Sequence, residues 1–258
     1  MTERPTERLI GRRSLLGGLA LGAGGMLLSG CDRLNASPDV RHLLEGAERL
    51  HYRSQRLVTG NALAREYGRA DMSPLFRVNG NARPTAPDYL AHAASGFADW
   101  RLVVDGLVAR PLRLSLSDLG GFPQRAQITR HDCVEGWSAI GKWQGPQLAA
   151  ILRAAGLSSR ANFLVFHCAD ESGGRPYYES IDLNDAFHPQ TILALLMNDH
   201  RLSVPHGAPV RLRVERQLGY KHAKFVMRIE ARDRIDNLYL GKGGYWEDRA
   251  DYAWYAGI

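Results

Sequence analysis

Apolar residues recur along the chain with two different spacings, and each spacing predicts an element. After Pro38-Asp39 they recur every three or four residues up to Leu50, which predicts an amphipathic helix. A second helix is predicted to begin at Pro146, a favoured first helical residue, and to end at Gly156. A third is predicted over residues 189–197, ending at Asn198.

Runs rich in β-branched and aromatic residues predict strands. Residues 100–104 and 107–114 flank Asp105-Gly106, a pair typical of hairpin turns, and a short helix capped by Ser115 follows them. Further strands are expected over residues 126–129, 163–168, 177–181, 210–214 and 225–230. In the stretch 210–214, Arg211 and Arg213 alternate with apolar residues, which predicts one polar face. Because strands outnumber helices and are irregularly interleaved with them, we expect an α+β fold of mixed sheets with short helices.

The N-terminal residues have the pattern of an export signal. Arg12-Arg13 precedes an uncharged apolar stretch that ends at Leu28 and is shorter than the roughly 20 residues of a spanning helix. Twin arginines in this place are typical of the route that exports folded proteins, although an ordinary signal with two arginines has the same pattern. Leu28-Ser29-Gly30-Cys31 resembles the lipobox of bacterial lipoproteins, in which Cys31 is diacylated. We therefore expect a periplasmic location, with a lipid anchor at Cys31.

Four segments are predicted from these patterns. Residues 1–30 are the signal peptide, residues 31–70 a helical arm or tether, and residues 71–235 a single domain that includes an irregular connection over residues 79–87. Residues 236–258 form an aromatic, glycine-rich tail that should pack on this domain. The net charge of +6 falls to +4 without the first 30 residues, which hold four Arg and two Glu. Because the basic residues are spread along the chain, nucleic acid is not an expected partner.

Cys133 has unusual neighbours. With Cys31 assigned to lipid, Cys133 and Cys168 remain, and in an oxidising compartment they could form a disulfide. However, Cys133 lies among charged and aromatic residues at the end of a predicted strand, whereas a structural cysteine usually has apolar neighbours. A thiolate is a soft ligand for a thiophilic metal, and one suffices when a cofactor brings its own sulfurs. The sequence has no Cys-x-x-Cys and no His-x-x-x-His, so a zinc site is not expected.

Three motifs in order carry a resemblance to a known family. They are FRVN at residues 76–79, ITRHDCVEGWS at residues 128–138, and HGAPVR at residues 206–211 followed by GYKHAK at residues 219–224. They resemble the molybdopterin-binding domain that sulfite oxidase shares with the bacterial periplasmic methionine sulfoxide reductase. The chain is identified as a member of the sulfite oxidase superfamily, which implies an oxidoreductase with Mo-molybdopterin as cofactor.

The resemblance implies roles for the matched residues. Cys133 would be the molybdenum ligand, while His206 and Arg211 match positions that hold the pterin and its phosphate. A phosphate needs fixed cationic donors, which Arg211, Lys221 and Lys224 could supply. The expected cofactor-binding residues are Asn79, Cys133, Cys168, Asp170, His206, Arg211, His222, Ala223 and Lys224.

Two departures from the family bear on the substrate. Sulfite oxidases follow the ligand cysteine with an arginine-bearing segment, whereas Glu135 stands here and would repel a dianion. This favours the reductase branch, although His206 stands where that branch has asparagine. Glu135 is a candidate catalytic residue beside Cys133, and Trp137 and Tyr178 are candidates for the substrate pocket.

The sequence therefore predicts an exported molybdenum enzyme that transfers an oxygen atom to or from a small substrate, with sulfur compounds among the candidates. No Cys-x-x-Cys-His haem-attachment motif occurs, so electrons are expected to pass through a separate partner, a cytochrome or a membrane haem protein. Two alternatives stay open. One is a cysteine hydrolase with Cys133 as nucleophile, and the other is a non-catalytic lipoprotein that binds an anionic ligand.

Overall fold

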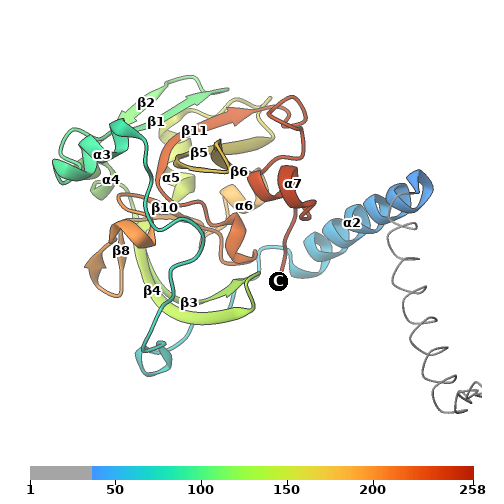
Figure 1. Cartoon of the computed structure of the whole chain (residues 1–258), viewed down its shortest axis with the longest axis horizontal. Helices are drawn as coiled ribbons and strands as arrows, with labels where there is room; N and C mark the ends of the chain where they lie inside the picture. The colour runs from blue at the N-terminus through green and yellow to red at the C-terminus, as the bar shows by residue number, and fades with distance from the viewer. Residues whose placement is uncertain (1–36) are drawn as a thin grey trace, which may run out of the picture. The chain divides into compact units, whose positions relative to one another are not determined.

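The computed structural model describes residues 37–258, which fall into two units. The first unit ends at Val58, and its described part is the helix α2 (Pro38–Thr59), as the periodicity predicted (Figure 1). The second unit is compact and comprises Thr59–Ile258. The predicted export signal and Cys31 lie outside the described residues. No helix between residues 37 and 258 is long and apolar enough to cross a membrane.

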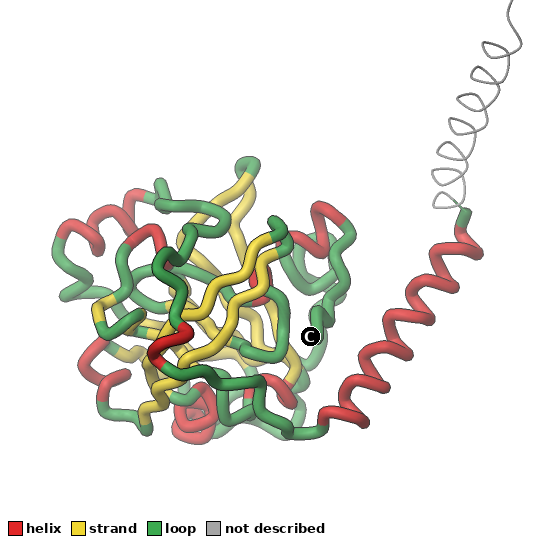
Figure 2. The backbone as a smooth tube through the Cα atoms, turned by 90° about the horizontal axis from the view of Figure 1, so that it is seen from below, coloured by secondary structure: helices red, strands yellow, loops and turns green. Residues whose placement is uncertain are grey.

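Three sheets build the second unit, and its strands alternate with short helices, so the α+β prediction is confirmed (Figure 2). A five-stranded sheet has the order β2-β1-β11-β5-β6, in which only β1 and β11 pair in parallel. Its strands are β1 (Leu102–Gly106), β2 (Leu112–Leu114), β5 (Phe163–Ser172), β6 (Arg175–Asp182) and β11 (Val226–Arg232). The four-stranded sheet contains β3 (Gln124–Cys133), β4 (Trp137–Pro146), β8 (Leu196–Met197) and β9 (His200–Arg201). The third sheet pairs β7 (Ile192–Ala194) with β10 (Arg211–Arg213).

Short helices connect these strands. The α-helices are α3 (Pro87–Ala94), α4 (Leu116–Gly120), α5 (Leu148–Ala155), α6 (Leu183–Ala186) and α7 (Tyr245–Ala250). The 3₁₀ turns are η1 (Arg69–Asp71), η2 (Val204–His206) and η3 (Gly219–Lys221). The capped helix predicted after residue 114 is confirmed, because the Ser115 side chain accepts the Asp118 N–H at 3.1 Å. Helix α5 ends at Gly156 as predicted, but it begins at Leu148 because Pro146 still belongs to β4.

The hairpin predicted around Asp105-Gly106 exists with a longer turn. Leu102 pairs with Leu114, and residues 107–111 connect the two strands. Gly106 serves a different purpose, since a Cβ there would lie 2.3 Å from the carbonyl oxygen of Ala231 on β11. The glycine therefore permits close approach of β1 and β11.

The helix predicted over residues 189–197 is wrong. Residues 192–194 form β7, and Ala194 lies opposite Arg211 of β10. All three β7 residues are fully buried, as a strand covered on both faces requires. A short apolar run has no polar face from which helical and extended periods could be told apart, so tertiary pairing decided its conformation.

The polar face predicted for β10 is also wrong. Arg211 and Arg213 are as buried as Leu212 between them. The Arg213 guanidinium pairs with Glu215 at 2.6 Å, and both arginines lie over the ring of Trp143, 5.2 Å from Arg211 and 4.3 Å from Arg213. The strand therefore places two cations in the protein interior. The alternation of residues alone would have predicted that both side chains face water.

One apolar cluster anchors the elements that carry the site. It joins the buried face of α5 to residues of β1, β5, β10 and β11, among them Leu102, Ile151, Phe166 and Ile229. Against this base, β3 and β4 form a long curved hairpin (Figure 1). Its last register pair is Cys133 with Trp137. The hairpin thus projects Cys133 at its tip.

The C-terminal tail is hydrogen-bonded to other parts of the second unit. Leu218 N–H donates to the Ala256 carbonyl at 2.9 Å, and Ile258 N–H donates to the Arg216 carbonyl at 3.0 Å. These bonds fix the C-terminal end of the segment that begins with α7 (Tyr245–Ala250). Residues from this tail therefore stand beside the loop that holds η3.

Candidate functional site

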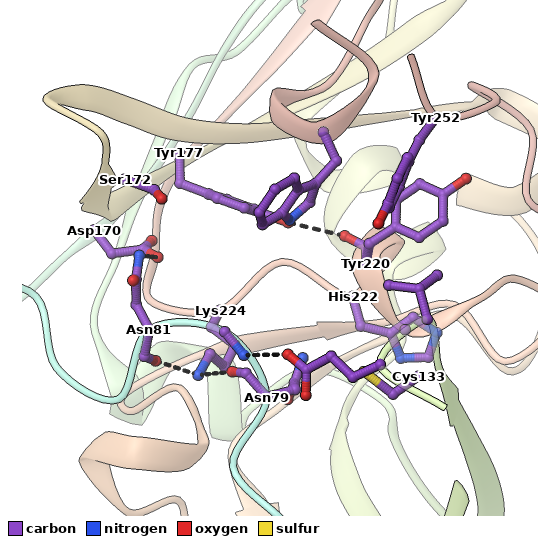
Figure 3. A pocket seen from close by; sticks show the side chains of 15 residues that line it. Asn79, Asn81, Cys133, Asp170, Ser172, Tyr177, Tyr220, His222, Lys224 and Tyr252 are labelled. Atoms are coloured by element: carbon purple, nitrogen blue, oxygen red, sulfur yellow. Dashed lines mark hydrogen bonds between the residues drawn. The ribbon is translucent and has the colours of Figure 1, made fainter. Parts of the chain in front are cut away.

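A pocket lies at the tip of the β3–β4 hairpin. Its volume is about 760 Å³, including the space at its open mouth. Separate parts of the chain line the pocket. They are the irregular connection after residue 78, the β3–β4 turn, the region of β5 and β6, the segment of η3, and the tail. Figure 3 shows Cys133, Asn79 and Lys224 facing Tyr177, Tyr220 and Tyr252 across the cavity. Segments remote in sequence thus converge on one site.

Cys133 contributes a thiol to this pocket. Both Cys133 and Cys168 are free, so the disulfide between them does not form in the structure. Burial raises the pKa of the Cys133 thiol and the Glu135 carboxylate adds to the rise, while a backbone hydrogen bond at Glu135 and the charge of Arg211 oppose it. The thiol is therefore protonated at neutral pH, and a bound metal cation would favour its thiolate form.

Glu135 lines the pocket beside Cys133. Its carboxylate accepts the Trp137 indole N–H at 3.0 Å, and the Gly80 N–H lies 3.5 Å away. The hairpin turn is thereby joined to the connection that carries Asn79. The acidic group predicted from the motif thus stands at the mouth of the same cavity as the thiol.

Two neutral histidines, His131 and His222, lie near the residues of the β3–β4 turn. His131 and His222 have ring centroids 5.2 Å apart, and burial followed by the charges of Arg211 and Arg213 lowers the pKa of both. His131 accepts from the Arg213 guanidinium at 3.1 Å, and His222 donates to the Gln217 carbonyl at 3.1 Å. Only His222 lines the pocket.

Gly219 is required by this packing. A Cβ at Gly219 would lie 2.5 Å from Cε1 of the buried His131. Gly219→Ala is therefore expected to lower the free energy of unfolding by about 1–3 kcal/mol through overpacking. Gly120→Ala is the matched control, since no atom lies within 4 Å of the position of a Cβ there. Urea denaturation of both variants checks this, and equal stability of the two would contradict it.

The base of the pocket is cationic. Lys224 donates to the Asn79 carbonyl at 2.7 Å and the Pro205 carbonyl at 3.0 Å, and also to the Asn81 carbonyl. Arg211 donates to the Asn79 side chain at 3.1 Å. The two cations therefore hold the connection over the pocket, and Asn79 lies where they meet.

Titration of Lys224 should control anion binding. Burial lowers the pKa of Lys224 to about 7, and the charge of Arg211 acts in the same direction, against the Asp170 carboxylate. Its charged fraction falls from about nine-tenths at pH 6 to about one-tenth at pH 8. Sulfate stays dianionic over this range, so its affinity for the cofactor-free chain should fall up to about tenfold as pH rises. Calorimetry should show a flat profile for Lys224→Met, and a flat profile for the parent chain would contradict the prediction.

Asp170 carries an unsatisfied buried oxygen. One carboxylate oxygen accepts from Asn81 at 2.8 Å, whereas the other has no hydrogen-bond partner among residues 37–258. Burial raises the pKa of this carboxyl. A buried polar atom without a partner costs free energy, so this atom is suited to meet a polar ligand.

Aromatic residues of the tail form the opposite wall, and the motifs gave no sign of them. Trp246 stacks on Tyr252 with ring centroids 5.9 Å apart, and Tyr252 meets Tyr220 edge to face at 5.1 Å. Tyr177 donates its hydroxyl to the Tyr220 carbonyl at 3.0 Å. The aromatic richness of the tail was the available signal, but only the fold shows which rings face the pocket.

Four predicted cofactor residues lie outside the pocket lining. Arg211 and His206 lie behind it, where His206 donates to the Phe76 carbonyl at 3.2 Å. Ala223 belongs to the main apolar cluster, and Cys168 packs against that cluster. Of the pair Cys168 and Asp170, only Asp170 lines the pocket. The predicted residues that do line it are Asn79, Cys133, Glu135, Asp170, His222 and Lys224.

Lys221 and Tyr178 contact other protein side chains and do not line the pocket. Lys221, considered for the phosphate, is fully buried between Glu179 and Glu247, with its ammonium 2.6 Å from the Glu247 carboxylate. Tyr178, considered for the substrate pocket, donates to Asp248, and its neighbour Tyr177 lines the cavity instead. Successive strand residues point to opposite faces, so the choice between the two tyrosines depended on a register that the sequence did not fix.

These features fit a molybdenum cofactor with a phosphorylated pterin. The donor set offers one soft thiolate for the metal, cations beneath the pocket for the phosphate, and an unpaired oxygen on Asp170 for a polar ring edge. Cys133 would hold the metal, while Asn79, Asp170, His222 and Lys224 would surround the pterin.

Comparisons with known proteins agree with this fit. A family model described as the oxidoreductase molybdopterin binding domain matches residues 90–239. The chain is 42% identical over 160 residues to a protein of Azospira oryzae that is provisionally named protein-methionine-sulfoxide reductase subunit YedZ1, covering 62% of this chain and 56% of that protein. It is 33% identical over 144 residues to the protein-methionine-sulfoxide reductase catalytic subunit MsrP of Campylobacter jejuni, covering 51% and 48%. The chain thus spans about half the length of these curated relatives.

A solved structure shares the fold. The sulfane dehydrogenase SoxCD from Paracoccus pantotrophus matches with a TM-score of 0.51 and 23% identity, over 59% of this chain and 41% of that one. The family match includes the motifs at residues 128–138 and 206–224, while the motif at residues 76–79 precedes it. The family match confirms the molybdopterin-binding oxidoreductase domain that these motifs predicted.

Proposed function

The chain belongs to the family of oxidoreductase molybdopterin-binding domains, and we propose that it is the catalytic part of an exported reductase acting on sulfoxides of the methionine type. The observation that carries this proposal is that Cys133, Glu135 and the cationic Lys224 line one pocket. The names of the two relatives support a sulfoxide as the substrate. Overall, the sulfoxide takes up two electrons and two protons and yields a thioether and water.

The protein residues would divide the work as follows. When bound, the molybdenum cofactor supplies the two-electron exchange and accepts or gives the oxygen atom. Cys133 would hold the metal and Lys224 would face the phosphate, while Arg211 would fix Asn79 from behind the pocket. Glu135 lies beside the thiol and would repel a dianion, which disfavours sulfite and leaves a neutral sulfoxide unaffected.

The aromatic wall suits a sulfur-containing side chain. Trp246 and Tyr252 present ring surfaces to the pocket, and sulfur makes favourable contacts with aromatic rings. The same rings limit the access of water. They would therefore orient a methionine-type substrate without charge.

Export, anchoring and an electron partner complete the proposal. A folded chain that carries a cofactor made in the cytoplasm needs a route for folded proteins, and Arg12-Arg13 fits this need. Cys31 would carry lipid at the periplasmic face of the membrane. The relatives are named as a subunit and a catalytic subunit, which supports a separate electron-transfer partner, a membrane haem protein or a cytochrome.

Activity of the purified, exported chain tests the function. With reduced viologen as electron donor, it should reduce methionine sulfoxide, free or in a peptide, and contain about one molybdenum per chain. The matched assay is sulfite oxidation with ferricyanide, in which we expect little turnover. A molybdenum-loaded protein that oxidises sulfite and leaves methionine sulfoxide intact would refute the substrate assignment.

The hydrolase alternative is not favoured by the site. A nucleophilic cysteine needs a lowered pKa or an imidazole partner. Burial raises the pKa of Cys133, which leaves this thiol a weak nucleophile. The binding-only alternative predicts a molybdenum-free preparation and is decided by the same metal measurement.

A further inference from the structure

Helix α2 gathers its aliphatic residues on one face, which Asp39, His51 and Ser54 interrupt. At 100° per residue, Val40, Leu43, Leu44, Ala47, Leu50, Leu57 and Val58 fall within an arc of about 140°. The exposed fractions are 73% for Leu43, 66% for Leu50 and 85% for Leu57, and no residue of the helix is buried. Exposed leucines aligned along one helix face, over 22 residues or about 33 Å, mark an interaction surface.

The opposite face is charged and of mixed sign. It carries Arg49 and Arg53 as well as Glu45 and Glu48, and the whole helix holds four Arg against three acidic residues. A helix with a leucine-rich face, a charged face and low mean hydropathy is typical of segments that lie in the membrane interface.

The place of the helix in the chain identifies its partner. Pro38 follows Cys31 by seven residues, which span at most about 25 Å. A lipid on Cys31 would hold the start of the helix at the bilayer, so the nearest apolar phase for the leucines is the bilayer itself. We propose that α2 lies flat in the membrane surface, with Leu43, Leu50 and Leu57 turned into the acyl region. This inference rests on the proposed lipid at Cys31.

Tryptophan fluorescence in brominated vesicles tests the orientation. The exported chain is reconstituted in phosphatidylcholine and phosphatidylglycerol vesicles whose acyl chains carry bromine. Leu50→Trp places the probe on the apolar face, and Arg49→Trp is the matched control on the charged face. The five native tryptophans all follow residue 99 and supply a background measured with the unsubstituted chain. Leu43→Trp and His42→Trp form a second pair if the first folds poorly.

The expected result is a blue-shifted emission at residue 50 with at least twofold stronger quenching by bromine than at residue 49. A blue shift without quenching would mean that protein covers the leucines, either the second unit or another copy, and would overturn the proposal. Equal quenching of both probes, or water-exposed emission from both, would also overturn it. Intact mass reports lipid on Cys31 separately, so loss of the anchor and loss of the helix contact are distinguishable.

Discussion

Replacing Cys133 by serine should lower the proposed sulfoxide reductase activity by more than about 100-fold, since losses of about 10–100-fold follow even from changes in residues that only support metal ligands. The serine hydroxyl keeps the size of the side chain and removes the soft sulfur donor. The Cys133 side chain lines the pocket at the end of β3 and is free of a disulfide. We therefore expect molybdenum content and activity to fall together in Cys133→Ser, measured by metal analysis and by viologen oxidation.

Cys168→Ala provides the control. Cys168 lies outside the pocket lining and packs against the main apolar cluster, and burial raises the pKa of its thiol well above the usual value. This variant should keep its molybdenum and its activity. If Cys133→Ser retained full molybdenum and full activity, a thiolate ligand at this position would be refuted.

Replacing Lys221 by methionine should lower the free energy of unfolding by about 3–5 kcal/mol, because removing one partner leaves uncompensated buried charge. Lys221 and its partners Glu179 and Glu247 are all fully buried. Burial alone would lower the pKa of Lys221, but the two carboxylates outweigh it and hold that pKa above its usual value. Burial followed by repulsion from Glu247 raises the pKa of Glu179.

The pH dependence gives this variant a distinctive signature. Without Lys221, the buried Glu179 carboxylate, whose pKa is already raised, binds a proton more tightly in the folded chain than in the unfolded one. The variant should therefore lose stability as pH rises above about 4.3, the ordinary value for Glu, through the raised pKa of Glu179 in the folded state. Urea denaturation at intervals of about one pH unit between pH 5 and pH 8 measures the free energy of unfolding of the variant and tests this dependence.

Two further variants separate the buried triad from general charge effects. Lys221→Met combined with Glu179→Gln should recover part of the loss, since one buried charge disappears with its partner. Arg234→Met removes an ion pair with Asp236 whose side chains are more than half exposed, and it should change stability little. Equal effects of Lys221→Met and Arg234→Met would contradict the role of burial.

The buried triad also joins two walls of the pocket. Lys221 follows Tyr220 in η3, Glu247 follows Trp246 in α7, and Glu179 lies on β6 two residues after Tyr177. The ion pairs of Lys221 with Glu179 and Glu247 therefore hold the aromatic residues in place, although none of the three charged residues lines the pocket. We therefore expect Lys221→Met to bind the proposed substrate, methionine sulfoxide, more weakly, in addition to being less stable.

The sequence by itself determined the family and the cofactor class, and it predicted Cys133 as the metal ligand. These inferences depend on short motifs whose residue types the chemistry requires, such as a thiol at position 133 and a lysine at position 224. It also determined the α+β class and the start of α2, because amphipathic periods and capping residues act locally. Local signals of this kind need no knowledge of distant parts of the chain.

Only the tertiary structure decided how the matched residues divide between the pocket and its support. Arg211 and Lys221 carry the same charge and look equally suited to a phosphate in the sequence, yet one lies fully buried behind the pocket bonded to Asn79 and the other is enclosed by two carboxylates. The aromatic wall at Trp246 comes from a tail about 110 residues beyond Cys133, counted along the printed sequence. Pairing, burial and register arise from contacts between distant segments, and local sequence patterns contain no record of them.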